Sequence, residues 1–125
     1  MGTVSDAVAN GWLDALCRGV PYDNDEVWVK LHLGDPGSAG TTNPAAETTR
    51  IQSTFGVGAT ARAISNTAAV EWTNVSTTEI YTHVSLWSAS TAGIFLGRDD
   101  LSSSASVEAG DTFRIPVGDL DLSVT

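Results

Sequence analysis

The sequence predicts a mainly β protein, an antiparallel β-sandwich of jelly-roll type with about eight short strands and one short N-terminal α-helix. Three observations predict it. The chain has 125 residues, which is the size of one domain. From Val27 onward the hydrophobic period is two, and turn-forming residues recur about every ten residues. We expect residues 1–22 to form the helix and a connector, and residues 23–125 to form the β-sandwich domain.

The N-terminal segment has the pattern of one amphipathic helix. Ser5 is a suitable N-cap, and Gly19 is a suitable C-cap. Between them Val8, Trp12 and Leu16 recur every fourth residue, which places them on one face. This apolar face needs a cover, which is either the body of the same domain or a neighbouring subunit.

Two strands have the strongest alternation. Val27, Val29 and Leu31 alternate with Trp28 and Lys30, as in a half-buried strand. Residues 80–87 form the second, and both of its faces carry aromatic or aliphatic side chains, so we expect both to be covered. Weaker strands are expected at residues 51–55, 61–64, 70–72, 94–96, 101–107, 112–115 and 120–124.

The charge balance excludes several classes of partner. Fifteen acidic residues against six basic ones give a net charge of −9, which disfavours binding to a phosphate backbone. We therefore expect no nucleic-acid partner. No apolar run reaches the roughly 20 residues of a membrane helix, and residues 1–11 lack the features of a secretory signal. We expect no membrane association.

Candidate metal ligands are few. The one cysteine, Cys17, excludes an intramolecular disulfide and is expected to be a small buried apolar residue. His32 and His83 each lie on the more polar face of a strong strand, and if those strands were neighbours they could share a metal with Asp35. Because zinc sites need three or four protein ligands, we favour a surface or interface histidine pair and expect no metal.

Other chemical signatures are weak. The acidic residues at 23–26 and 99–100 do not have the spacing of an EF-hand loop, so we favour solvated loops over weak cation sites. The chain has no Gly-x-Ser-x-Gly sequence, and its glycine-rich segment 34–40 lacks a Gly-Lys-Ser/Thr ending. We expect no catalytic residues, no cofactor and no enzymatic activity.

Three of the four tryptophans are candidate partner contacts: Trp12, Trp28 and Trp87. Trp28 falls on the strand face opposite Val27 and Val29, so a sheet covered on one side would expose it. An exposed tryptophan is a good interface anchor. The alternative is that the N-terminal helix covers Trp28.

Five stretches together resemble a known family. They are VKLHLGDPG at residues 29–37, NPAAE at 43–47, THVSLWSA at 82–89, AGDTFRIP at 109–116 and GDLD at 118–121. Following an amphipathic N-terminal helix, they resemble small bacteriophage virion proteins of the tail fibre or minor tail type, as found in phages of actinobacteria. The resemblance covers nearly the whole chain.

The resemblance implies a non-enzymatic virion protein made in the host cytoplasm. We expect it to be tail-associated, as a minor tail or fibre/tip protein, and to assemble symmetrically as a homo-oligomer, for example a trimer. Its expected partners are other tail proteins or the major capsid protein. The alternatives are a capsid decoration protein on the head exterior and a carbohydrate-binding module that recognises the host surface.

Overall fold

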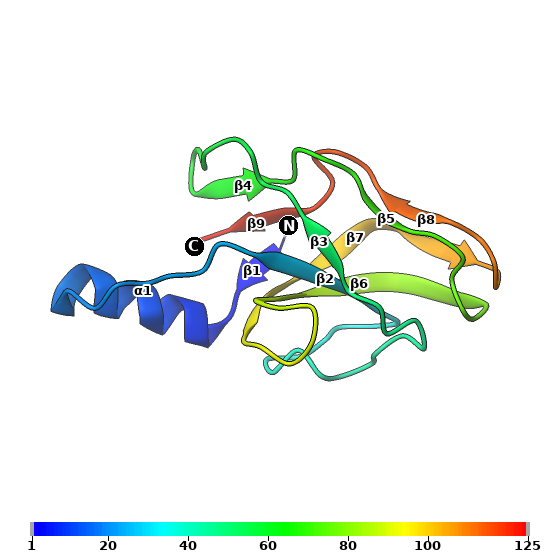
Figure 1. Cartoon of the computed structure of the whole chain (residues 1–125), viewed down its shortest axis with the longest axis horizontal. Coiled ribbons are helices and arrows are strands. Elements are labelled where there is room, and N and C mark those ends of the chain that lie inside the picture. Colours follow the sequence, from blue (N-terminus) through cyan, green and yellow to red (C-terminus); the bar gives the residue numbers. More distant parts are fainter. Residues whose placement is uncertain (1, 125) are drawn as a thin grey trace.

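The computed structural model describes residues 2–124 and shows a mainly β protein with one helix, as predicted (Figure 1). The helix is α1 (Asp6–Arg18). The strands are β1 (Gly2–Val4), β2 (Val27–His32), β3 (Ile51–Ser53), β4 (Ala63–Ser65), β5 (Val70–Trp72), β6 (Glu79–Trp87), β7 (Phe95–Val107), β8 (Phe113–Ile115) and β9 (Asp121–Ser123).

Seven of the strands form one curled sheet in the order β3-β2-β6-β7-β1-β9-β4, and β5 pairs with β8 in a separate ribbon. The described strand pairs are antiparallel apart from β1 and β9, which run parallel. The short strand β1 was not predicted, because three residues carry no periodicity. Its partners, β7 and β9, come from the other end of the chain.

The core lies on one face of the central strands. Val29 and Leu31 of β2 pair across the sheet with Leu86 and Val84 of β6, and all four side chains are fully buried. Such burial is worth roughly 1.5–3 kcal/mol per side chain. The β5–β8 ribbon packs on this core through Phe113, whose ring centroid lies 5.2 Å from the ring centroid of Tyr81.

Around His32 the opposite face is covered by the long loop between β2 and β3. The Nδ1 of His32 bonds the Thr42 carbonyl at 2.8 Å, and Gly40 packs directly against the ring of Phe95. His32 is therefore fully buried, and its prediction as a surface histidine was wrong. The prediction failed because the loop that covers His32 has no periodic pattern of its own.

Candidate interaction surface

The helix α1 is fixed to the sheet at its base. The Ser5 hydroxyl donates to the Phe95 carbonyl at 2.6 Å and accepts from the Val8 N–H at 3.3 Å. The Ser5 N–H donates to the Leu96 carbonyl at 2.8 Å. The N-cap that starts the helix is thus also a link to β7, and the predicted helix with its Ser5 and Gly19 caps is confirmed.

Beyond this base the helix projects from the body, and the connector to β2 returns along it (Figure 1). The ring of Tyr22 packs on Gly11, where an added Cβ would come within 2.5 Å of it. The same ring meets Trp12 edge-on, with centroids 6.5 Å apart. We call this projection, residues 5–26, the arm.

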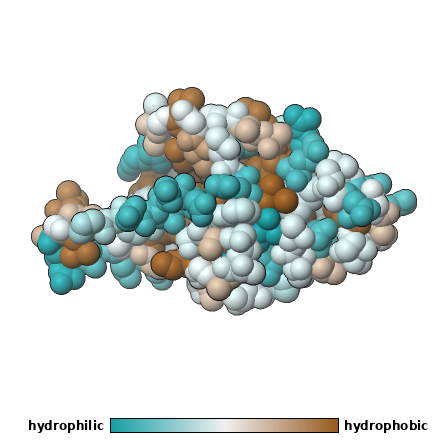
Figure 2. Space-filling view, viewed as in Figure 1, coloured by the Kyte–Doolittle hydropathy of each residue, from teal (hydrophilic) through white to brown (hydrophobic). Residues whose placement is uncertain are grey.

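Most of the helix's apolar face is left in solvent. Val8 is the buried residue of α1, whereas Leu13 is 59% exposed and Leu16 is 82% exposed. Figure 2 shows hydrophobic residues at the far end of the arm, next to hydrophilic ones. Cys17 is exposed as well, so its prediction as a buried residue was wrong. The reason is that this part of the helix extends past the sheet that would have covered it.

A groove of about 410 Å³ runs between the arm and the sheet. Trp12 and Tyr22 form its arm side, and Asn24 and Asp25 lie at its polar edge. The remaining lining residues are Val4, Val8, Val27, Ser53, Phe55, Ile64, Leu96 and Leu122. Its character is mainly apolar.

Trp28 and Trp87 lie together and away from Trp12. They are directly opposite each other on β2 and β6, and both are half-buried. The Trp87 indole donates to the Ser85 hydroxyl at 2.7 Å, and the Arg50 guanidinium lies 4.4 Å from the Trp87 ring centre. Because side chains alternate along a strand, Trp28 faces away from Val27, which lines the groove with Trp12.

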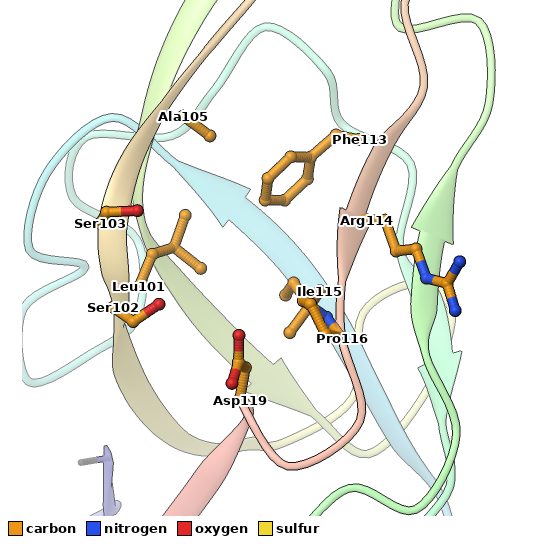
Figure 3. Close-up of a pocket in the computed structure, with 9 residues that line it drawn as sticks. All are labelled: Leu101, Ser102, Ser103, Ala105, Phe113, Arg114, Ile115, Pro116 and Asp119. Carbon is orange, nitrogen blue, oxygen red and sulfur yellow. The ribbon is translucent and has the colours of Figure 1, made fainter.

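A third feature is a pocket of about 280 Å³ between β7 and β8 (Figure 3). It lies where β7 bulges: β6 advances two residues, from Tyr81 to His83, while β7 advances five, from Asp100 to Ala105. The ring of Phe113 points into the space between the strands, and the Arg114 side chain points away from it. The lining residues are Leu101, Ser102, Ser103, Ala105, Phe113, Arg114, Ile115, Pro116 and Asp119.

His32 and Ser85 resemble a catalytic pair only in their distance. The Nε2 of His32 lies 2.7 Å from the Ser85 hydroxyl, but both side chains have no exposed surface. The other ring nitrogen bonds a backbone carbonyl, that of Thr42, rather than a carboxylate. The pair therefore links two strands and a loop, and substrate has no access to it in this structure.

The two histidines do meet, since His32 and His83 are directly opposite on neighbouring strands. Both nitrogens of His32 are already bonded, to Thr42 and Ser85. Within residues 2–124, no group of three or more His, Cys, Asp or Glu side chains is arranged to hold a metal ion. In the same part of the chain, no helix has the length and apolar character needed to cross a membrane.

The sequence also matches a known protein family. The family model described as "Podophage GP4 fiber I protein gp80" matches residues 3–123, nearly the whole chain. The chain belongs to this family. No curated protein matches it.

Membership of the fiber I family confirms the phage fibre resemblance seen in the sequence. It makes the chain a bacteriophage virion protein of structural type, which associates with other virion proteins. A fibre family is a structural one, which agrees with the expectation that the chain is not an enzyme.

The sequence does not predict two features of these surfaces: the side of the groove formed by Phe55 and Leu122, and the β7–β8 pocket. Phe55 and Leu122 line the groove beside Trp12, although they come from weakly patterned segments far along the chain. The β7–β8 pocket depends on a bulge, and its only trace in the sequence is a serine run at 102–104. The sequence predicts only a strand at residues 101–107, because polar residues alone do not reveal a bulge.

Proposed function

We propose that this fiber I family chain is a structural subunit of the phage tail, in its fibre or tip region, and that its copies assemble as a symmetric homo-oligomer, with a trimer as the expected form. Its role consists of folding and binding, without catalysis. The observation that carries the structural role is the arm, because a capped helix with exposed leucines is suited to attaching this chain to another virion protein.

The proposed contacts are the three tryptophans. Trp12, in the groove, and the Trp28–Trp87 pair, on the other face of β2, offer two separate aromatic surfaces. Tryptophan is enriched among residues that dominate binding energy. The net charge of −9 keeps free subunits soluble and apart until such surfaces meet.

Imaging of intact virions tests the location. An antibody against this chain, or cryo-electron microscopy of particles carrying a tagged copy, is expected to place it on the tail. Signal on the head alone would overturn the tail assignment and would support a capsid decoration protein instead.

Light scattering of the purified chain tests the assembly. We expect a mass of at least twice the 13.0 kDa of one chain, and of three times that mass for a trimer. Trp28→Ala, which removes one of the half-buried pair, is expected to lower that mass, while Ser102→Ala on the exposed β7 bulge leaves it unchanged. A monomeric wild-type chain would contradict the homo-oligomer.

The β7–β8 pocket favours a second candidate function, binding of a host-surface carbohydrate. Its apolar wall, two serine hydroxyls and the Asp119 carboxylate are groups that can hold a sugar ring by its face and its hydroxyls (Figure 3). Adsorption of particles to host cells tests it. Asp119→Asn with Ser103→Ala should reduce adsorption without reducing incorporation, and unchanged adsorption would exclude this pocket as the glycan site.

A further inference from the structure

We propose that the arm is a docking element that places its uncovered leucine face in an apolar groove edged by Lys and Arg side chains, on a virion protein other than this chain. The inference rests on the proposed role as a virion subunit, and it specifies the chemistry of the partner and the surface used.

The first step is that the exposed apolar face is rigid. Ser5 fixes the base of α1 to β7 through the Phe95 and Leu96 carbonyls. At the other end Gly19 has a φ of 68°, and the Val20 N–H donates to the Asp14 carbonyl at 3.3 Å. Tyr22 packs along the middle of the helix. The surface is therefore preorganised, which lowers the entropy cost of docking.

The second step is that the arm has more apolar surface than its own domain uses. Leu13, Leu16 and Val20 are 59%, 82% and 44% exposed. On a helical wheel the two leucines lie within 60° of each other, so they form one face. A helix that presents such a face to a groove is a common mode of recognition.

The third step is the net charge of the arm. Asp6, Asp14, Asp23, Asp25 and Glu26 all belong to the arm. Its single basic residue, Arg18, already bonds Asp14 at 3.2 Å. The arm thus has a net charge of −4, close to half that of the whole chain. An arm with this net charge is attracted to a partner that carries Lys and Arg side chains beside its groove.

The same charge argues against a second copy as the occupant. The groove on this chain has Asp25 at its edge, so an acidic arm from another copy would meet like charge there. None of the residues that line this groove is basic. The copies are therefore expected to associate through other surfaces.

Cys17 provides a direct test because it is exposed on the arm and is the one cysteine of the chain. We expect N-ethylmaleimide to label it readily in the purified chain and about tenfold more slowly in intact virions, since the partner covers the arm there. The control is a Cys17→Ser, Val57→Cys chain, whose thiol lies on the body at a position that is 67% exposed in the wild type. It should label equally fast in both. Equal labelling of Cys17 in chain and virion would overturn the inference.

Incorporation gives a second test that does not depend on labelling. Leu13→Ser with Leu16→Ser is expected to lower the amount of chain in purified virions by about tenfold, the equivalent of 1.4 kcal/mol. Val57→Ser with Val117→Ser, which also removes two exposed apolar side chains, should incorporate normally. Neutralising the connector by Asp23→Asn, Asp25→Asn and Glu26→Gln should lower incorporation as well, whereas normal incorporation of this variant would overturn the basic-edged partner.

The remaining outcomes separate the two proposals. If the leucine variant lowers the mass of the purified oligomer, or if Cys17 is already protected in that oligomer, the occupant is a second copy and the inference is wrong. If the leucine variant incorporates normally while the wild-type chain is found on the tail, the inference fails and the proposed function stands. If the wild-type chain is absent from virions, both fail.

Discussion

The Nε2 of His32 lies 2.7 Å from the hydroxyl of Ser85, between adjacent strands and without exposed surface on either side chain. Because the Thr42 carbonyl can only accept, the Nδ1 of His32 carries the proton and its Nε2 accepts from Ser85. Ser85 in turn accepts from the Trp87 indole at 2.7 Å. The three hydrogen bonds therefore form a chain. Trp87 donates to Ser85 on β6, Ser85 donates to His32 on β2, and His32 donates to the Thr42 carbonyl of the covering loop.

This arrangement predicts a pH-dependent stability. Burial lowers the pKa of His32 below its ordinary value of 6.5. The unfolded chain takes up the proton first as the pH falls below about 6.5, so the stabilisation by neutral His32 is complete above that pH and is lost below it. We expect His32→Asn to cost about 2 kcal/mol at pH 7.5 and less at pH 5, measured by urea unfolding. A cost that does not change with pH would contradict this.

Asp99 predicts a change of the opposite sign. Burial raises the pKa of its carboxyl from 3.8 to about 6, and the N–H of Asp121 donates to it at 3.2 Å. A raised pKa means that its contribution to stability is fully present below pH 3.8 and is lost as the pH rises through about 6. The full difference corresponds to roughly 3 kcal/mol. Asp99→Asn should therefore gain stability relative to the wild type between pH 4 and pH 8, and a constant difference would refute the assignment.

Two tryptophans form a matched pair for mutation. The Trp72 indole donates to the Thr49 carbonyl at 2.8 Å, whereas the buried Trp28 indole N–H has no hydrogen-bond partner among the described residues. Trp72→Phe leaves the Thr49 carbonyl without the indole donor, whereas Trp28→Phe removes an N–H group that makes no hydrogen bond among the described residues. We expect Trp28→Phe to be about 1 kcal/mol less destabilising in chemical unfolding. Equal costs would show that the Trp28 N–H has a partner in solution.

Asn66 is predicted to be the most sensitive polar residue of the fold. It is 1% exposed, and its side chain donates to the Ala68 and Pro116 carbonyls and accepts from the N–H groups of Gly118 and Leu120. Asn66→Ala removes all four bonds, although the Gly118 N–H keeps the Asn66 main-chain carbonyl at 3.1 Å and the Pro116 carbonyl keeps the Asp119 N–H at 3.2 Å. A loss of about 3 kcal/mol is expected, mainly because the Ala68 carbonyl and the Leu120 N–H lose the Asn66 side chain. The exposed Asn10→Ala should change stability by less than about 0.5 kcal/mol. Thermal unfolding of both variants provides the comparison.

Much of the fold could be predicted because its signals are local. The Ser5 and Gly19 caps define α1 through bonds within a few residues, and the sequence predicts both. The alternation along β2 and the central part of β6 identifies Val29, Leu31, Val84 and Leu86, which form the core. Period two is a property of any half-buried strand, so it can be recognised before the partner strand is known.

The misassigned residues depend on contacts between distant segments. His32 is buried because the loop around Thr42 covers it, and Cys17 is exposed because α1 extends beyond the sheet. No pattern at either position records these facts. Whether a side chain is covered depends on which other segment packs against it, and that packing forms only in the folded protein.

Local signals are enough to predict a small, acidic, mainly β protein with a capped N-terminal helix, and five stretches are enough to predict a phage fibre family. The projection of the helix as an arm, and the pocket that the β7 bulge opens toward β8, depend instead on how distant segments pack. The difference is one of range along the chain. Caps and periodicity act over a few residues, whereas the unpredicted β1, which holds the arm to the sheet, pairs with residues more than ninety positions away.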